Sequence, residues 1–297
     1  MIQPSNYRRE FLKQALATGL LASLPTQTLR AVEKKLPKKP LYSCSTVNFS
    51  SLPLEKACER IAALGFDAVD IWHTVGSIKC PHFQEIVDDL QPKGLNAILD
   101  KHRLKLGSFS LYSGGYPQHA KWIAQWPETV IVQGSRARKN DNLTDDMKQF
   151  LEEIKPKLEL CEKYDAYLAV ENHSGNALLD KMDSLKAFTD LNRNKRLGIA
   201  LAPYHLMHNG ESVADAIRVC GPQMFFIYFW TNEGGEKQMP GVGQTDVSGW
   251  FHALNDIKYS RYVTPFMHHE PEPDRMEELH RISRKFLDQT FETAFSQ

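Results

Sequence analysis

Glu171 is the residue of this sequence whose setting points most directly to chemistry. It ends the apolar run Leu168-Ala169-Val170. A carboxylate beside such a run is costly to remove from water unless it binds a cation or exchanges a proton with a ligand. A salt bridge to a lysine or arginine of a neighbouring strand is the structural alternative. His173 follows two residues later and faces the same way if an extended conformation continues.

Histidines also stand directly after short apolar runs. The chain contains 11 histidines, and four of them occupy such positions. One histidine in this place usually caps a helix or packs in a core, but four together favour a polar pocket, with or without a divalent metal ion. The four are His73, His173, His205 and His268.

The apolar runs are typical of the strands of an alternating β/α chain. Each contains β-branched or aromatic residues, and amphipathic helical stretches lie between them, as in parallel sheets covered by helices. Eight such units in this length favour the α/β class with a single closed (β/α)8 TIM barrel over an open doubly wound sheet. The predicted strands are residues 41–47, 68–72, 105–111, 129–133, 167–171, 197–202, 224–230 and 262–267. The predicted helices are residues 54–64, 83–101, 119–126, 144–164, 179–191, 212–219, 248–257 and 273–291.

A TIM barrel places its active site at the carboxyl ends of its strands. Polar and aromatic residues at the predicted strand ends are therefore the candidates for function. No GxGxxG follows the first strand and no P-loop is present, so the fingerprints of dinucleotide and ATP binding are absent from the sequence. We predict Glu171, His205 and His268 as catalytic residues, and Trp72, His73, Arg136, His173 and Trp230 as substrate-binding residues.

The first 31 residues are predicted to be a twin-arginine export signal. Residues 6–13, Asn-Tyr-Arg-Arg-Glu-Phe-Leu-Lys, resemble the twin-arginine consensus, and an apolar run follows from Ala15 to Leu24. That run is too short to anchor the chain stably in a bilayer. Ala31 is the candidate cleavage point, and an amphipathic N-terminal helix of a cytosolic protein is the alternative. Residues 32–40 are predicted to be a charged linker, and residues 41–297 are predicted to form the barrel. The exported protein is predicted to work in the periplasm.

Composition supports one globular domain with a small-molecule ligand. Hydrophobic residues make up 42% of the chain, enough for one large core. Lys plus Arg number 36, and Asp plus Glu also number 36. The chain therefore lacks the excess of basic residues that would predict nucleic-acid binding. The five cysteines are odd in number and no two form a CxxC pair. Buried free thiols are predicted, with one or two disulfides as the alternative in an oxidising compartment.

Three stretches make the whole mature chain resemble the xylose isomerase-like barrel family. They are Glu171-Asn172-His173, the run from Gly198 to His205, and the loop from Pro240 to Asp246, set within the β/α rhythm. This family groups sugar isomerases and epimerases with DNA-repair endonucleases. The resemblance implies a carbohydrate ligand. Epimerases of this family hold a divalent cation, often manganese, by Glu, Asp, His and Glu side chains at the ends of strands 5 to 8, so the resemblance also implies a metal ion there.

The predicted ligand positions depart from that pattern. Glu171 matches the first glutamate, which in the family also moves protons. Ala202 stands at the aspartate position and Phe229 near the histidine position. His268 stands at the second glutamate position, with Glu270 two residues further on. The standard metal site of the family is therefore altered.

Two arrangements of the site remain open. In the first, a divalent metal ion is held by Glu171, His205 and His268, with or without His173. This ligand set is rich in nitrogen, so it suits manganese, zinc, iron or nickel better than magnesium. In the second, no metal is bound, and Glu171 and one histidine act as base and acid around a sugar stacked on tryptophan. His205 also matches a family histidine that contacts substrate.

Both arrangements predict an enzyme like the sugar isomerases and epimerases, which abstract a proton next to a carbonyl. The outcome is isomerisation, epimerisation or β-elimination of a keto-sugar, because all three start with that step. It requires a base, here Glu171, and a cation or hydrogen-bond donors for the enediolate oxygen. Arg136 is predicted to anchor substrate oxygens. The alternative is a non-catalytic sugar-binding barrel, whereas a nuclease is disfavoured. The loop 241–246 is predicted to be an ordinary connection, with a substrate-covering loop as the alternative.

Overall fold

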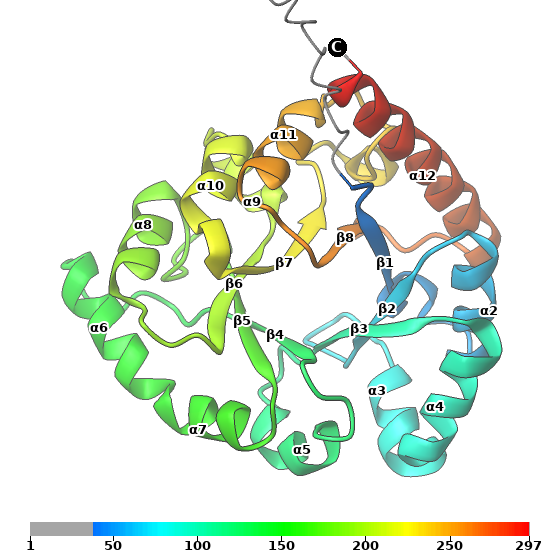
Figure 1. Cartoon of the computed structure of the whole chain (residues 1–297), viewed down its shortest axis with the longest axis horizontal. Coiled ribbons are helices and arrows are strands. Elements are labelled where there is room, and N and C mark those ends of the chain that lie inside the picture. Colours follow the sequence, from blue (N-terminus) through cyan, green and yellow to red (C-terminus); the bar gives the residue numbers. More distant parts are fainter. Residues whose placement is uncertain (1–37, 297) are drawn as a thin grey trace, which may run out of the picture. The chain divides into compact units, whose positions relative to one another are not determined.

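Eight parallel strands close into one barrel in the computed structural model, which describes residues 38–296. Each strand pairs with the next in sequence, and β8 pairs with β1 (Figure 1). The TIM barrel predicted from the sequence is confirmed. The predicted export signal and most of the predicted linker lie outside the described residues. The strands are β1 (Leu41–Ser45), β2 (Ala68–Trp72), β3 (Lys105–Ser110), β4 (Val130–Gly134), β5 (Tyr167–Glu171), β6 (Leu197–Leu201), β7 (Met224–Phe229) and β8 (Tyr262–Pro265).

Helices surround the barrel in nearly the predicted order, with three differences. A π-helical stretch interrupts the helix predicted over 83–101, and Pro156 stands in the first turn of a second helix inside the segment predicted over 144–164. Pro203 begins a short helix that was not predicted. The helices are α2 (Leu54–Ala63), α3 (His82–Glu85), α4 (Gln91–His102), α5 (Tyr116–Ile123), α6 (Leu143–Glu153), α7 (Lys155–Lys163), α8 (Met182–Leu191), α9 (Pro203–His208), α10 (Val213–Cys220), α11 (Ser248–Asp256) and α12 (Pro273–Phe295). Shorter turns are η1 (Thr46–Phe49), η2 (Ile86–Leu90), η3 (Gly221–Gln223) and η4 (Gly235–Gln238).

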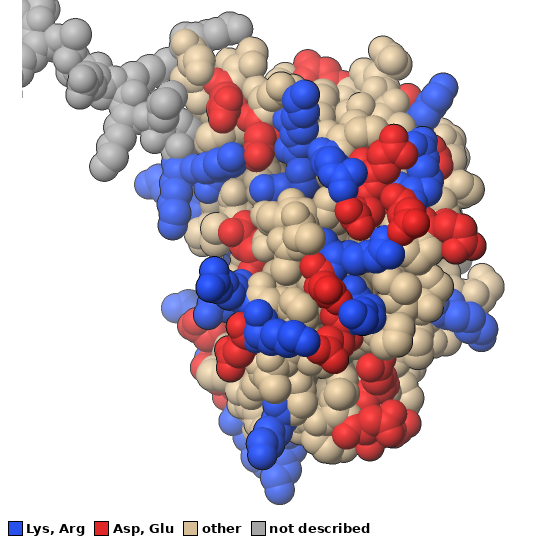
Figure 2. All heavy atoms as spheres, turned by 90° about the vertical axis from the view of Figure 1, so that its right-hand side faces the viewer, with Lys and Arg blue, Asp and Glu red and all other residues tan. Residues whose placement is uncertain are grey.

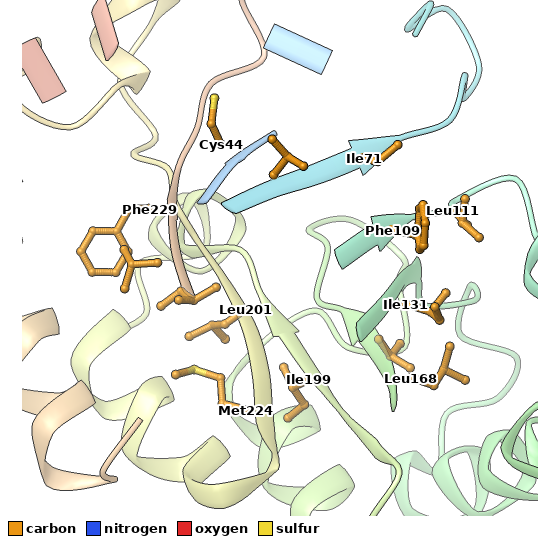
Figure 3. Close-up of a cluster of buried hydrophobic side chains, with 14 of the residues drawn as sticks. Cys44, Ile71, Phe109, Leu111, Ile131, Leu168, Ile199, Leu201, Met224 and Phe229 are labelled. Carbon is orange, nitrogen blue, oxygen red and sulfur yellow. The ribbon is translucent and has the colours of Figure 1, made fainter. Parts of the chain in front are cut away.

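Alternation along the strands divides the apolar residues between two cores. One face of each strand packs against the helices, and Figure 3 shows side chains of this outer core, among them Ile71, Phe109 and Phe229. The other face fills the barrel. There, small side chains on β5 and β6 make room for aromatic rings of β7. The barrel interior includes Ala169, Ala200, Phe226 and Tyr228.

The outer surface carries interleaved charges of both signs. Figure 2 shows basic and acidic side chains mixed over the face that contains α2 and α12. Arg60 of α2 and Arg281 of α12 both pair with Glu277. Among the described residues, none of the helices has both the length and the apolar character needed to cross a membrane. All five cysteines are buried, and each is a free thiol.

Candidate functional site

Glu171 is the last residue of β5, and its carboxyl is buried with 7% of the residue exposed. No lysine, arginine or histidine of residues 38–296 forms an ion pair with it, so the structural alternative of a salt bridge is not found there. Burial is the main cause that raises the pKa of Glu171, to about 8, and the negative charge of Asp70 adds to it. A hydrogen bond with Tyr112 acts in the opposite direction. Glu171 is therefore a carboxyl that changes protonation state near neutral pH.

Asp70 is a second buried carboxyl inside the barrel, and it is not among the site residues predicted above. It lies in the middle of β2 and is fully buried. Oδ2 accepts from Ser45 Oγ and Trp72 Nε1 at 2.7 Å each, and Oδ1 accepts from Ser108 Oγ and Ser110 Oγ at 2.8 Å each. A charged residue between apolar neighbours of a strand was the available signal. Three of its four partners, the serines, come from neighbouring strands and could not be read from the sequence.

Two tyrosines connect the region of Asp70 to that of Glu171. The Tyr228 hydroxyl, from β7, lies 3.2 Å from Ser110 Oγ and 3.0 Å from the Tyr112 hydroxyl. Tyr112 follows β3 and is half-buried, and it lies close enough to Glu171 to lower the pKa of that carboxyl. Neither tyrosine was predicted as a site residue.

His205 and His173 lie against each other at the ends of β6 and β5. Because Pro203 starts α9, His205 stands on a helix rather than on a strand end. Its ring centroid is 3.9 Å from that of His173, and its Nδ1 lies 3.0 Å from Ser174 Oγ. Burial, with the neighbouring histidines, lowers the pKa of His205 to about 3. His205 is therefore neutral at physiological pH. Since β5 ends at Glu171, His173 does not continue the strand, and its side chain is exposed.

Trp72 and Trp230 are buried, with 2% and 4% of their surfaces exposed. The Trp72 ring stacks on Phe266 at 5.6 Å, and the Trp230 ring stacks on Tyr204 at 4.2 Å. Both indole N–H groups have acceptors, Asp70 for Trp72 and Gln238 for Trp230. Their broad faces already contact protein, so neither ring presents an open platform for a sugar.

His268 follows β8 beside Trp230. The two ring centroids lie 4.8 Å apart at a steep angle. The His268 backbone N–H donates to Gln238 Oε1, which also accepts from Trp230, so Gln238 joins the ends of β7 and β8. His268 Nδ1 is 3.6 Å from the Glu270 carboxyl.

His73 and Arg136 are engaged on the helical side of the strands. The His73 ring packs edge-on against Phe83 of α3 at 5.6 Å. The Arg136 guanidinium pairs with Asp146 at 2.6 Å and with Glu153 at 2.9 Å, both from α6. These contacts give both side chains structural partners, and neither is used in the function proposed below.

The predicted ligands Glu171, His205 and His268 do not form a ligand set. Within residues 38–296, no three His, Cys, Asp or Glu side chains are arranged to hold a metal ion. His205 is stacked on His173, and Glu171 has a tyrosine as its hydrogen-bonding neighbour. The family's aspartate position is Ala202, which is buried and supplies no side-chain donor atom. Phe229, near the family's histidine position, faces Trp250 in the outer core. The residues present do not fit the family's four-ligand site, and we assign no step to a metal.

A family model described as a xylose isomerase-like TIM barrel matches residues 58–289. The chain belongs to this family. The resemblance inferred from the sequence is thereby confirmed at the level of the family. No curated protein sequence matched the chain.

Solved structures with the same fold include enzymes that act on sugars. A D-psicose 3-epimerase crystallised with D-fructose is 15% identical, with a TM-score of 0.67 over 84% of this chain and 99% of that one. The 3-keto-D-glucoside 4-epimerase of E. coli is 14% identical, with a TM-score of 0.67 over 84% and 100%. An IolI protein with a bound zinc atom is 14% identical, with a TM-score of 0.67 over 87% and 100%. At these identities the likeness establishes the fold.

Proposed function

We propose that this protein is an enzyme that removes a proton from the carbon next to a carbonyl of a carbohydrate. The observation that carries the proposal is the buried Glu171 carboxyl, whose pKa of about 8 lies near neutral pH. Proton transfer is most efficient when the pKa of the base lies near the working pH. Epimerases among the structural neighbours support a sugar as the substrate.

Glu171 in its ionised form takes the proton, and neutral side chains stabilise the enediolate. The Tyr112 hydroxyl lies next to ionised Glu171, and it turns to the developing oxygen anion as Glu171 takes the proton. His205 is neutral because burial lowers its pKa, so it acts as a hydrogen-bond donor. His268 has a buried Nδ1 without a hydrogen-bond partner in the described part of the chain, and it is the second candidate donor. Returning the proton to the neighbouring carbon gives isomerisation, and returning it to the other face gives epimerisation.

Deuterium exchange tests this function whichever product the enzyme forms. The purified protein is incubated in D2O with free ketohexoses and with 3-keto-glycosides, and NMR follows loss of the C–H signal next to the carbonyl. We expect the rate to rise with pH until Glu171 is ionised, at a pH of about 8. Glu171→Gln should lower it by roughly 10²–10⁴-fold. Unchanged exchange in a folded Glu171→Gln protein rejects the proposal. Sugar binding without exchange in either protein identifies the sugar-binding barrel instead.

Export by the twin-arginine route is the second part of the proposal. The paired Arg8 and Arg9 carry it, and they lie outside the described residues. Cell fractionation should find the wild-type protein in the periplasm and a variant with Arg8→Lys and Arg9→Lys in the cytoplasm. Arg30→Lys, outside the motif, is the matched control. An unchanged distribution of the double variant contradicts export by this route.

A further inference from the structure

The indole of Trp230 packs against two of the histidines that were predicted as metal ligands. Its ring centroid lies 5.3 Å from that of His205 and 4.8 Å from that of His268, at 84° to each. A histidine binds a metal ion such as zinc through a ring nitrogen at about 2.0–2.1 Å, so the ligands of one ion turn their nitrogens toward a common point. Here each imidazole instead packs against an indole. An indole offers a metal no nitrogen electron pair, because its one nitrogen is only a hydrogen-bond donor.

Two contacts hold this indole in place. It stacks on Tyr204 with 4.2 Å between the ring centroids, and its Nε1 donates to Gln238 Oε1 at 2.8 Å. Gln238 Oε1 also accepts from the backbone N–H of His268 at 3.0 Å, which ties the acceptor to the end of β8. Trp230 is only 4% exposed. Swinging the indole outward would break the stack and the hydrogen bond together, so the ring is a fixed part of the site.

The other positions of the family's ligand set do not compensate for this indole. Ala202 is buried and has no side-chain donor atom. Phe229 belongs to the outer core, whereas Trp230 belongs to the inner core. The strand end near which the family's epimerases carry a histidine therefore turns a tryptophan into the barrel. Glu171 is the one residue of the family's four-ligand pattern that this chain keeps.

We propose that this barrel works without a metal ion, and that the Trp230 indole fills the space in which the metal site of the family's epimerases would lie. The inference deepens the proposed function, on which its catalytic meaning rests. Without a cation, neutral hydrogen-bond donors alone stabilise the charge on the enediolate oxygen. Donors aimed at a developing charge can fill this role in a site from which water is excluded.

Metal analysis of the full-length protein, with any affinity tag removed, tests the proposal without a substrate. Elemental analysis of freshly purified protein should find far less than one manganese, zinc, iron or nickel ion per chain. EDTA should leave the melting temperature unchanged, because removing an ion that binds only the folded state would lower it. Titration calorimetry with Mn²⁺ and Zn²⁺ should detect no binding that depends on Glu171. A stoichiometric ion that is present in wild type and lost in folded Glu171→Gln overturns the proposal.

Trp230→His tests the part assigned to the indole. It removes the ring that packs against both histidines and adds a candidate ligand, so calorimetry should detect a new one-to-one Zn²⁺ site. Trp250→His is the matched control, because Trp250 is also buried, with 5% exposed, but packs against Phe229 in the outer core. It should bind no more Zn²⁺ than wild type. A folded Trp230→His protein that binds no more Zn²⁺ than this control contradicts the role of the indole.

The metal proposal and the proposed function fail in different ways. Circular dichroism shows which variants are folded, and the metal analysis of wild type decides the proposal even where Trp230→His does not fold. Metal-free wild-type protein that catalyses no exchange in D2O rejects the proposed function alone. Exchange that EDTA abolishes and Mn²⁺ restores rejects metal independence alone.

Discussion

Arg136 lies just beyond β4, but its guanidinium is engaged without any ligand. It donates to the Asp146 carboxyl at 2.6 Å and to Glu153 at 2.9 Å. Asp146 is fully buried. Although burial acts to raise it, hydrogen bonds from Arg136 and from the Lys139 backbone hold the pKa of Asp146 below its usual value. A position at a strand end therefore does not by itself place a cation in the site.

Arg136→Ala should destabilise the fold and leave chemistry in the remaining folded protein unchanged. It would strand the buried Asp146 carboxylate, which costs roughly 3 kcal/mol of unfolding free energy. Lys139→Ala is the matched control, because its ammonium forms an exposed pair with the same Glu153 and its loss should change the stability little. Urea denaturation measures both. Unchanged stability combined with lost deuterium exchange would instead identify Arg136 as a substrate anchor.

Single residues were predictable where the signal was local. Glu171 could be selected because one charge ends an apolar run. Asp70 and Tyr228 could not, because their roles depend on hydrogen bonds across 25 to 118 positions of sequence. The tryptophans were selected correctly as residues near the strand ends, but sequence alone could not show that other rings cover their faces.

At the scale of elements, the strands were the most predictable part of this chain. Each begins within one residue of its predicted start, because a short apolar run between polar turns is a local pattern. Helix α9 was missed, since the run that ends at Ala202 reads on into Pro203-Tyr204-His205. Proline at the first helical position fixes a helix start there, and it places His205 on a helix instead of at a strand end.

The loop Gly241–Asp246 is held by one carboxylate. Glu233 accepts from the backbone N–H of Gln244 at 2.9 Å and of Thr245 at 3.0 Å, and from the Thr245 hydroxyl at 2.8 Å. Although burial acts to raise it, these bonds hold the pKa of Glu233 below its usual value. The loop is therefore tied to the segment that follows β7, as an ordinary connection would be.

Gly243→Ala should release this loop. A Cβ at Gly243 would overlap the Glu233 carboxyl, which cannot withdraw without losing its hydrogen bonds. We expect a loss of roughly 1–3 kcal/mol in unfolding free energy and faster hydrogen exchange at Gln244 and Thr245. Gly234→Ala is the control, because nothing lies within 4 Å of a Cβ there. Unaltered exchange in Gly243→Ala would show that Glu233 does not hold the loop.

For the molecule as a whole, buried neutral groups give stability two opposite dependences on pH. Burial lowers the pKa of both His205 and His280 to about 3, so the folded state keeps them neutral. Their contribution is present above the ordinary histidine pKa of 6.5 and is lost as pH falls toward 3. Glu171 acts in the other direction, since the folded state keeps it protonated. Its contribution is complete below pH 4.5 and is lost as pH rises toward 8.

Glu171→Gln should therefore stabilise the barrel on the alkaline side. The glutamine keeps the size of the side chain and never ionises, so the variant should gain unfolding free energy over wild type as pH rises from 4.5 to about 8. The gain should be on the order of a few kcal/mol and should vanish near pH 4. Glu233→Gln is the control of opposite sign. The pKa of Glu233 is lowered, which means that its charged form stabilises the fold, so the glutamine variant should lose stability above pH 4.5. Urea denaturation at a series of pH values measures the stability of both variants. Parallel pH profiles for wild type and Glu171→Gln would show that Glu171 is ionised in the folded protein at neutral pH, which contradicts the raised pKa.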